Sequence, residues 1–514
     1  MRPTHPRAHR VDDIATAFGL RLVTGADPDT QVTGLAVGSD DVAPGDLFVA
    51  LRGLKRHGAE FAEQALAAGA RAVLTDEDGA KLLGEADVPV LVAEDPRSTV
   101  GDIAAWAYGY PAHDLTTVAV TGTNGKTTTA YFVDAAQKAR FGTTAVLGTV
   151  ELRIGEESIE SPRTTVEAPV LHAILALARE RGAGAATVEA SSHALALHRT
   201  AGVEFDVVGF TNLQRDHLDF HGDMDTYLAD KARLFAAGQA SRGVVVVDDE
   251  WGERMVALAQ IPVETVATRP GPASATADWA VTEANIGLDG VGSSFSLRTP
   301  DGTVLAAASP LPGLVNVSNA ALAIVLAHRS GVDLDDAIAA VGSAHAIPGR
   351  MERVVERGDG WPLCLVDYAH TPDALELALQ AVRPITPGRL VIVFGSDGDR
   401  DRGKRPLMGE VAAGLADVLV VTDENPRSED PATIRAAILD GVRRARPDGR
   451  DVHEVSPRAD AIRRALDLAG DADTVIVTGK GHEPTQEVAG VFHRYNDRDV
   501  YLAVRAERSA RAGS

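Results

Sequence analysis

Short apolar runs rich in β-branched residues alternate along this chain with Ala/Leu-rich stretches in which apolar residues recur at helical spacing. This alternation is typical of βαβ units, in which helices cover parallel strands. The clearest helices are expected at Thr129–Ala139 and Ala461–Ala469. Strands are expected at Thr117–Val120, Ala186–Glu189, Gly243–Val247, Leu390–Phe394, Val418–Thr422 and Thr474–Thr478. The pattern therefore predicts an α/β protein with parallel sheets.

The chain of 514 residues is too long for a single hydrophobic core, and its length predicts about three domains. A proline would stop a helix inside Tyr110–Asp114, directly before a new strand. Proline and glycine interrupt a second helical pattern at Ile347–Gly349. We therefore expect domains formed by residues 1–111, 112–346 and 347–514.

The composition indicates an ordinary globular protein, with 45% hydrophobic and 24% charged residues. No apolar run approaches the roughly 20 residues of a membrane helix, and the first residues lack the apolar stretch of a secretory signal. Cys364 is the only cysteine, which excludes an intrachain disulfide and a cysteine-built metal site. A net charge of −23 without a Lys/Arg-rich run argues against nucleic acid and anionic lipid as partners. We expect a cytoplasmic monomer.

A glycine-rich turn follows the strand expected at Thr117–Val120 and leads directly into a helix. In such a turn, backbone N–H groups and the helix N-terminus form a cradle for phosphate. Lys126 would reach the β/γ-phosphates of ATP, and the Thr127 hydroxyl would bind magnesium. The loop is a variant, because valine stands where the common form has its first glycine. The ATP-binding residues predicted here are Gly122, Thr123, Asn124, Gly125, Lys126, Thr127 and Thr128.

Acidic and histidine residues follow the next strands. Glu189 ends a predicted strand of the nucleotide-binding sheet, where a carboxylate is well placed to hold magnesium. The segment 210–222 and Lys231 add many polar groups that would be costly to bury without a ligand. His217 taken alone would more often be an ordinary polar residue. Together with the phosphate loop and Glu189, it becomes a candidate metal ligand.

Short motifs in a fixed order connect these groups to a known family. The motifs are Pro44–Phe48, Thr121–Thr129, Glu189–His193, Asp216–Asp219, Pro348–Glu352, Asp367–Asp373, Gly398–Asp401, Asn425–Arg427 and Gly479–Glu483. With them the chain resembles the Mur ligase family, which builds the peptide of bacterial cell-wall precursors. Within that family it is similar to the ligases that add the third residue. The likeness runs from about Val37 to Asp497.

The resemblance implies a central P-loop ATPase-like parallel-sheet domain, preceded by a uridine-nucleotide-binding domain and followed by a Rossmann-like domain. It implies that ATP phosphorylates the D-glutamyl carboxylate of UDP-N-acetylmuramoyl-L-alanyl-D-glutamate, and that an amine attacks the acyl phosphate. Both steps accumulate negative charge among phosphates and carboxylates, so cations must be placed in advance.

The resemblance also assigns roles in catalysis. Lys126 would contact the transferred phosphate, Glu189 one magnesium and His217 a second. Lys231 would be carbamylated to N6-carboxylysine, which turns a cation that repels magnesium into an anionic ligand. The adenine, the γ-phosphate and the ribose would be contacted by Asn319, Arg350 and Asp367, respectively. Closure of the third domain would then complete the site and exclude water.

Further positions match the family's contacts with the acceptor. Those for the uridine nucleotide and the muramoyl dipeptide are Val37, Ser39, Leu54, Lys55, Arg56, Thr164, Thr165, Ser191 and Arg199. Asp40 and Leu314 stand where arginine is usual in the family. Leu197 replaces a glutamine, and this deletes a hydrogen bond worth about 0.5–1.5 kcal/mol.

The third domain would select the amine. The matching positions are Arg400, Glu424, Asn425, Pro426, Arg427, Gly479 and Glu483. Diaminopimelate carries a second amino-carboxylate end, which Arg427 could bind with its bidentate fork. Glu424 replaces the usual aspartate and reaches one methylene further, so the pocket can be reshaped. We expect meso-diaminopimelate as the amine, with L-lysine or L-ornithine as alternatives.

Two other functions compete with this one. A different ligase of the same fold could add D-alanyl-D-alanine or glutamate to folate, but Asp216–Asp219 and Asn425–Arg427 argue against both. The loss of catalytic residues would favour an inactive nucleotide-binding scaffold of the cell-wall pathway, but all four candidates are present, namely Lys126, Glu189, His217 and Lys231. ATP turnover that depends on both the acceptor and the amine would separate these hypotheses.

Overall fold

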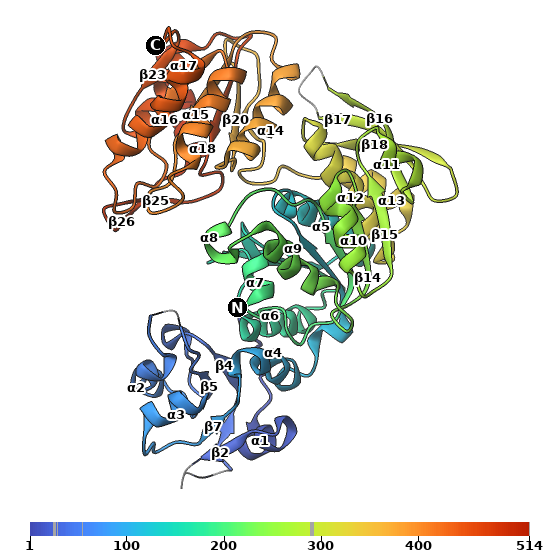
Figure 1. Cartoon of the computed structure of the whole chain (residues 1–514), viewed down its shortest axis with the longest axis vertical. Helices are drawn as coiled ribbons and strands as arrows, with labels where there is room; N and C mark the ends of the chain where they lie inside the picture. Colours follow the sequence, from blue (N-terminus) through green and yellow to red (C-terminus); the bar gives the residue numbers. More distant parts are fainter. Residues whose placement is uncertain (24–26, 28, 54, 288–291, 513–514) are drawn as a thin grey trace. The chain divides into compact units, whose positions relative to one another are not determined.

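The computed structural model describes residues 1–23, 27, 29–53, 55–287 and 292–512, and Figure 1 labels many of its helices and strands. The chain forms two compact units. Unit 1 consists of Met1–Val266 and Leu322–Ala337, and unit 2 of Ala267–Ala321 and Ile338–Ser514. The domain boundaries predicted near residues 111 and 347 remain predictions.

The first part of unit 1 is built on a sheet with the strand order β2-β7-β6-β5-β4. Strands β4 to β7 are parallel, and β2 is antiparallel to β7. Its elements are β1 (His9–Arg10), α1 (Val11–Phe18), β2 (Arg21–Val23), β3 (Gln31–Val32), β4 (Gly34–Ala36), η1 (Ser39–Asp41), β5 (Asp46–Val49), η2 (Gly58–Phe61), α2 (Ala62–Ala67), β6 (Ala72–Thr75), α3 (Glu77–Leu83), β7 (Val90–Val92), α4 (Pro96–Ala107) and η3 (Pro111–Asp114).

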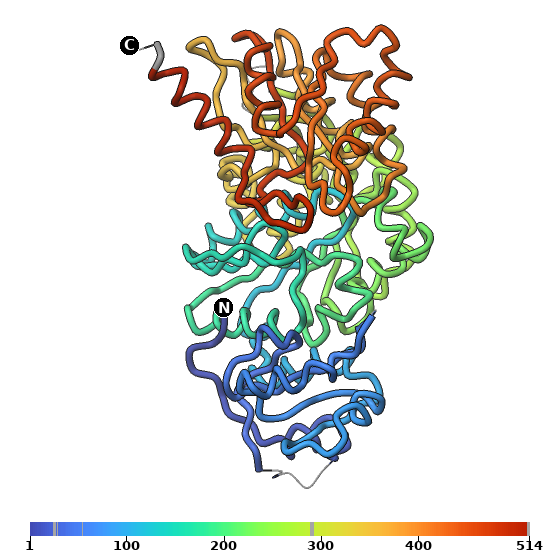
Figure 2. The backbone as a smooth tube through the Cα atoms, turned by 90° about the vertical axis from the view of Figure 1, so that its left-hand side faces the viewer, coloured from blue at the N-terminus to red at the C-terminus, as the bar shows by residue number. Residues whose placement is uncertain are grey.

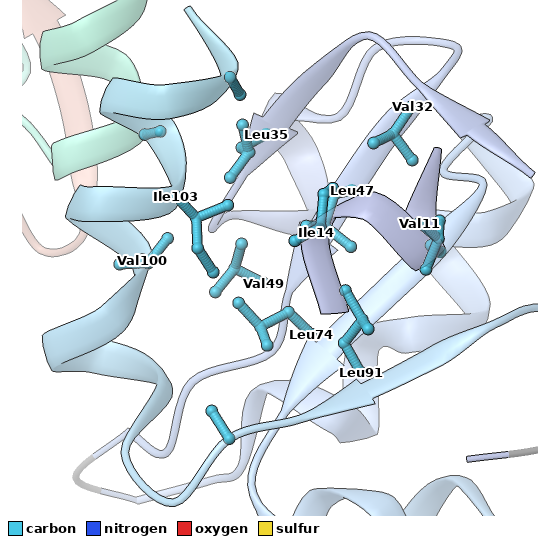
Figure 3. Close-up of a cluster of buried hydrophobic side chains, with 14 of the residues drawn as sticks. Val11, Ile14, Val32, Leu35, Leu47, Val49, Leu74, Leu91, Val100 and Ile103 are labelled. Atoms are coloured by element: carbon cyan, nitrogen blue, oxygen red, sulfur yellow. The ribbon is translucent and has the colours of Figure 1, made fainter. Parts of the chain in front are cut away.

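Alternate side chains of this sheet fill two different cores. Leu47 and Val49 pack with Ile14 of α1 and Ile103 of α4, as Figure 3 shows. Phe48, between them, belongs to a second cluster that includes Ala62 and Ala65 of α2. Because successive side chains of a strand point to opposite faces, helices cover the sheet on both sides.

The second part of unit 1 contains strands in the order β11-β10-β9-β12-β8-β13-β14-β15. In this order the strands β9, β12, β8, β13, β14 and β15 are parallel to one another. Strand β10 pairs antiparallel with β9, and β11 pairs antiparallel with β10 at the edge of the sheet. Its elements are β8 (Thr116–Thr121), α5 (Lys126–Phe141), β9 (Thr144–Leu147), β10 (Glu151–Ile154), β11 (Glu157–Glu160), α6 (Ala168–Glu180), β12 (Ala185–Glu189), α7 (Ser192–Ala196), β13 (Phe205–Phe210), α8 (Leu218–His221), α9 (Met224–Ala232), η4 (Arg233–Phe235), β14 (Ala240–Val246), α10 (Glu250–Leu258) and β15 (Val263–Ala267). The loops after β8, β12 and β13 meet at one edge of this sheet because these strands are parallel neighbours.

Unit 2 begins with α11 (Pro272–Thr276) and the antiparallel strands β16 (Trp279–Ile286), β17 (Ser293–Arg298) and β18 (Val304–Ser309). Helices α12 (Leu314–Arg329) and α13 (Leu334–Gly342) follow, and each is divided between the units, because Leu322–Ala337 belong to unit 1. The rest of unit 2 is a sheet of order β19-β20-β24-β21-β22-β23, parallel except for β19. Its elements are β19 (Glu352–Val355), β20 (Leu363–Asp367), α14 (Pro372–Val382), η5 (Arg383–Ile385), β21 (Leu390–Phe394), α15 (Lys404–Leu415), β22 (Val418–Val421), α16 (Pro431–Ala445), β23 (Val452–Glu454), α17 (Arg458–Leu468), β24 (Thr474–Thr478), the hairpin β25 (Thr485–Val488) and β26 (Val491–Arg494), and α18 (Asp497–Ala512).

The core of this sheet is covered on one face by α17 and by α18, the red helix that ends the trace in Figure 2. Ile462 and Tyr501 from these helices pack with Val391 and Val475 of the strands. Cys364 lies in the same core, fully buried, and burial raises the pKa of its thiol to about 12.

The elements expected from periodicity are confirmed with shifted ends. The strands predicted at Leu390–Phe394 and Thr474–Thr478 have those bounds in the structure. Helix α5 begins three residues before the predicted Thr129, because Gly125 makes a left-handed turn (φ 88°) that starts the helix at Lys126. Among the described residues, no helix is long and apolar enough to cross a membrane.

Candidate active site

The loop between β8 and α5 has the backbone of a phosphate cradle. Gly122 has a φ of 146°, and a Cβ there would lie 1.9 Å from Thr211 Oγ1. Gly125 lies in the left-handed region at the start of α5. Both positions therefore require glycine, and the N–H groups at the helix start are left to bind an anion.

Polar residues after β13 hold this loop from one side. Asn212 Oδ1 accepts from the Asn124 N–H at 3.0 Å, and Thr211 Oγ1 donates to the Asn124 carbonyl at 2.7 Å. The Gln214 N–H donates to Thr123 Oγ1 at 3.0 Å. The sequence marked this segment as polar, but it did not assign these residues to the support of the loop.

Lys126 folds over the loop that precedes it. Its Nζ donates to the carbonyls of Gly122 and Thr123, each at 3.0 Å. The ammonium therefore lies at the mouth of the cradle, where a phosphate would replace these carbonyls as its partner.

Glu189 is fully buried at the end of β12, where three donors of two threonines surround it. Its Oε2 accepts from the hydroxyls of Thr127 and Thr149, and its Oε1 from the Thr149 N–H, all at 2.9 Å. The hydroxyl and carboxylate are hard oxygen donors, and magnesium usually takes one or two of these together with phosphate oxygens. The pair of Thr127 and Glu189 therefore fits magnesium, while Thr149 was not predicted. Among the described residues, no group of three or more His, Cys, Asp or Glu side chains could hold a metal ion.

Lys231 is buried on α9, with its amine aimed at the phosphate loop. Its Nζ donates to the Gly122 carbonyl at 2.8 Å and lies 4.4 Å from the centre of the Tyr227 ring. Burial and the nearby charge of Lys126 lower the pKa of Lys231 well below its usual value. A neutral amine can therefore form here, inside the protein and not on its surface.

His217 precedes α8 in the left-handed region (φ 54°) and is partly exposed. Partial burial, with a smaller contribution from the neighbouring His193, lowers the pKa of His217 to about 4. The ring meets His193 edge to face at 4.7 Å. The buried His221, which the sequence did not single out, connects α8 to α9 and α7, with Nδ1 2.8 Å from Asp230 Oδ2 and Nε2 2.9 Å from Ser192 Oγ.

The residues predicted to hold the muramoyl dipeptide form one cluster beside Glu189. Thr165 Oγ1 donates to the Glu189 carbonyl at 2.6 Å and accepts from the Ser191 N–H at 3.0 Å. Thr164 Oγ1 lies 3.1 Å from Thr149 Oγ1 and donates to it, because the single hydroxyl proton of Thr149 goes to Glu189. Arg199 reaches the same place, 3.4 Å from the Thr165 carbonyl. Leu197, the departure noted above, ends the short helix α7 between Ser191 and Arg199.

The predicted uridine positions lie in the first part of unit 1. Val37 packs against its core, and Ser39 begins the turn η1. Lys55 and Arg56 are exposed, and Leu54 lies outside the described residues. The departing Asp40 accepts from Gln64 Nε2 at 2.6 Å, so its carboxylate has a partner within the protein.

The ATP contacts predicted in unit 2 lie on three segments. Asn319 is buried in α12 and donates to Asn316 Oδ1 at 3.1 Å. The Arg350 guanidinium lies 4.3 Å from the centre of the Tyr368 ring. Asp367 ends β20 and accepts from two backbone N–H groups, and burial raises its pKa. Leu314, where the family usually has arginine, is 47% exposed.

The residues predicted for the amine meet where β22 and β24 end. Asn425 donates to Glu483 at 3.0 Å, and Lys480 donates to both of them at 2.9 Å. Although burial alone would raise it, Lys480 and Asn425 hold the pKa of Glu483 below its ordinary value. A Cβ at Gly479 would lie 2.6 Å from Glu424 Oε2, so glycine makes room for that carboxylate.

Arg427 is fixed through its backbone to the hairpin β25–β26. Its N–H donates to the Glu487 carbonyl at 3.0 Å, and its carbonyl accepts from the Ala489 N–H at 2.6 Å. Its φ is 54°, in the left-handed region. Pro426 precedes it, and Arg400 is exposed in the loop after β21.

This fold, with a phosphate loop beside a buried carboxylate, defines an α/β nucleotide-binding enzyme. Three family models match consecutive segments of the chain: "Mur ligase family, catalytic domain" at residues 31–108, "Mur ligase middle domain" at 120–327, and "Mur ligase, glutamate ligase domain" at 349–481. The chain belongs to the Mur ligase family, whose members are ATP-dependent ligases. The predicted fold class and family are confirmed.

Several named relatives match nearly the whole chain. The UDP-N-acetylmuramyl-tripeptide synthetase of Leifsonia xyli subsp. xyli is 47% identical, over 98% of each chain. The UDP-N-acetylmuramoyl-L-alanyl-D-glutamate–2,6-diaminopimelate ligase of Streptomyces coelicolor is 44% identical, over 97% of each chain. A solved structure of a UDP-N-acetylmuramoyl-L-alanyl-D-glutamate–2,6-diaminopimelate ligase is also similar. Its sequence is 33% identical, the TM-score is 0.66, and the match covers 98% of this chain and 100% of that one.

Proposed function

We propose that this protein uses ATP to join meso-diaminopimelate to the D-glutamate of UDP-N-acetylmuramoyl-L-alanyl-D-glutamate, through an acyl phosphate. The reaction extends the peptide of the peptidoglycan precursor, on which cell shape and division depend. The observation that carries the choice of amine is the position of Arg427, a guanidinium beside the Asp397 carboxylate at the carboxyl edge of the unit 2 sheet. Relatives with 42–44% identity carry the name of this reaction.

The phosphate loop supports the ATP half of the proposal. Lys126, already at the mouth of the cradle, would follow the γ-phosphoryl group as it moves to the D-glutamyl carboxylate. The carboxylate oxygen forms the new bond to phosphorus, and the bond from phosphorus to the ADP oxygen breaks. Asn319, Arg350 and Asp367 remain the proposed contacts of the adenine, γ-phosphate and ribose.

Magnesium would be held by Thr127 and Glu189, with His217 and carbamylated Lys231 at a second ion. Bound magnesium would neutralise charge on the phosphates. Lys231 supports the carbamate because its buried amine can be neutral. That amine would attack the carbon of CO2, forming an N–C bond and releasing one proton, and an anionic oxygen would then replace the cation.

The acceptor would be held in unit 1 by two groups of residues. Thr164, Thr165, Ser191 and Arg199 would take the dipeptide, since their hydroxyls and guanidinium gather beside Glu189. Val37, Ser39, Leu54, Lys55 and Arg56 remain the proposed uridine-nucleotide contacts. Thr149 connects the dipeptide cluster with the phosphate-loop side of the site, because its hydroxyl is hydrogen-bonded to both Thr164 and Glu189.

The amine would be held in unit 2 by Arg427 and the residues around it, namely Arg400, Glu424, Asn425, Pro426, Gly479 and Glu483. We place the reaction in the cytoplasm, where ATP and the nucleotide precursor are available, and we propose that the enzyme acts as a monomer. L-Lysine and L-ornithine remain the alternatives, because Glu424 replaces the usual aspartate and reaches one methylene further, which can reshape the pocket.

Phosphate release tests this function. The protein is incubated with ATP, magnesium and the acceptor nucleotide, and then with meso-diaminopimelate, L-lysine or L-ornithine. We expect release and a ligated product, identified by mass spectrometry, with diaminopimelate. The variant Lys126→Ala should release none. Release mainly with L-lysine or L-ornithine would reassign the amine, and no release with any amine would refute the ligase assignment for this acceptor.

A further inference from the structure

Buried polar atoms without a partner gather at the carboxyl ends of three neighbouring strands in unit 2. The order β24-β21-β22 brings these strand ends together. Among the described residues, the buried side-chain atoms there that lack a hydrogen-bond partner are Ser396 Oγ, Asp397 Oδ1, Thr422 Oγ1, Glu424 Oε2, Arg427 Nε and Thr478 Oγ1. Buried polar groups in native proteins are nearly always paired, so this set indicates a place that a polar ligand completes.

Asp397 is the one charged side chain of this set to which the sequence analysis assigned no role. It lies two residues beyond the glycine that follows β21, and its carboxylate is 16% exposed. Its Oδ2 lies 3.6 Å from Arg427 Nη2, too far for a hydrogen bond but close enough for charge attraction. The two side chains therefore face each other with hydrogen-bonding capacity left on both.

A second carboxylate lies against Asp397. Burial raises the pKa of Glu424 to about 8, and the charge of Asp397 is the next largest cause. The cations Lys404 and Arg458 offset this rise only in part, and they donate to the His370 carbonyl and to Asp497. The Lys480 Nζ likewise already donates to Asn425, Glu483 and the Thr485 carbonyl. The site has more acceptors than donors, as a site for a ligand ammonium should.

We propose that Asp397 determines which amine is used, by accepting the ammonium of the distal amino-acid group of the incoming diamino acid while Arg427 takes the carboxylate of that same group. This inference rests on the proposed function. An amino-acid group carries its ammonium and carboxylate on one carbon, so a facing anion and cation 3.6 Å apart are complementary to it. Arg427 alone would not distinguish this group from a plain carboxylate.

The test compares two substrates that differ only in the distal ammonium. L-2-Aminopimelate keeps the reacting amine and the distal carboxylate of meso-diaminopimelate but has no distal amino group. Asp397→Asn should raise the KM for diaminopimelate about tenfold or more, because it removes a charge-assisted hydrogen bond. The same variant should leave kcat/KM for L-2-aminopimelate within about twofold of the wild type, so the preference for diaminopimelate is lost.

Matched measurements separate recognition from folding. The control variant is Asp448→Asn. Asp448 is an exposed carboxylate of unit 2 that accepts a hydrogen bond from the Arg450 N–H. The kinetics of this variant should match those of the wild type. The KM for ATP of Asp397→Asn should also match. Equal losses with both substrates would show a structural role and overturn the inference, as would an unchanged preference. A wild type that ligates neither substrate would overturn the proposed function and this inference with it.

Discussion

Arg458, the first residue of α17, holds together the strand ends that carry the proposed amine site. Its guanidinium is fully buried and donates to both oxygens of Asp497 at 2.8 and 2.7 Å. It also donates to the carbonyls of Thr478 at 2.8 Å and Asp423 at 3.3 Å, at the ends of β24 and β22. Although burial alone would lower it, the Asp497 carboxylate holds the pKa of Arg458 above its ordinary value. One cation therefore bonds three segments of unit 2.

Replacing Arg458 with methionine should destabilise unit 2 by about 3–5 kcal/mol. The change leaves the Asp497 carboxylate buried with no cation, and breaking a buried ion pair from one side costs about this much. The Tyr495 hydroxyl, which donates to Asp497 Oδ1 at 2.9 Å, would compensate only in part. The double variant Arg458→Met/Asp497→Leu should recover part of the loss, since no charge stays buried.

Urea unfolding and hydrogen exchange measure this effect. Exchange of the β24 amides should accelerate in Arg458→Met, because the local opening free energy falls with the ion pair. The control is Arg463→Met on the same helix, which removes an exposed pair with Glu507 and should cost about 1 kcal/mol or less. The reasoning is refuted if Arg458→Met stays within about 1 kcal/mol of the wild type, or if the double variant is less stable than the single one.

Three further predictions concern the loop and the two sites. Gly122→Ala should raise the KM for ATP roughly five- to 150-fold, from about 1–3 kcal/mol of backbone strain, whereas Gly142→Ala, also at positive φ but with open space, should leave that KM unchanged. Carbon-13 bicarbonate should give a carbamate NMR signal that Lys231→Arg abolishes, and a signal that persists in the variant would contradict the assignment. Because the pKa of Glu424 is raised from 4.5 to about 8, the folded state binds this proton more tightly, and stability should fall as the pH rises from about 4.5 to 8. In urea titrations Glu424→Gln should reduce that fall, and an unchanged slope would contradict the raised pKa.

The sequence alone predicted six of the parallel strands, because buried strands such as Leu390–Phe394 are continuous apolar runs. The phosphate loop was predictable because all its parts, the glycines at positive φ and the lysine at the start of the helix, lie next to one another in the sequence. Element ends were less predictable. The strand expected at Gly243–Val247 is β14, Ala240–Val246, and it begins three residues earlier because Ala240 pairs with Phe205 of the neighbouring β13.

The site residues that the sequence analysis did not predict are those whose partners lie far away in the chain. Thr149 follows β9 and bonds Glu189 forty residues later, so no spacing rule could connect them. In the acidic loop after β21, three aspartates stand close together in the chain, and the backbone decides which one faces the site. Asp399 bonds Ser428, whereas Asp397 faces Arg427. Sequence reasoning chose Arg400 in this loop and passed over Asp397.

The burial of Cys364 makes the protein well suited to site-specific labelling. It is the chain's one thiol, and with its pKa raised to about 12 it stays protonated and unreactive at neutral pH. A cysteine introduced at Val491, which is 54% exposed in the hairpin bonded to Arg427, would be the single reactive thiol of an otherwise native enzyme. A dye placed there would report the arrival of the amino acid as a fluorescence change, without a coupled assay and without removing any natural residue of the site.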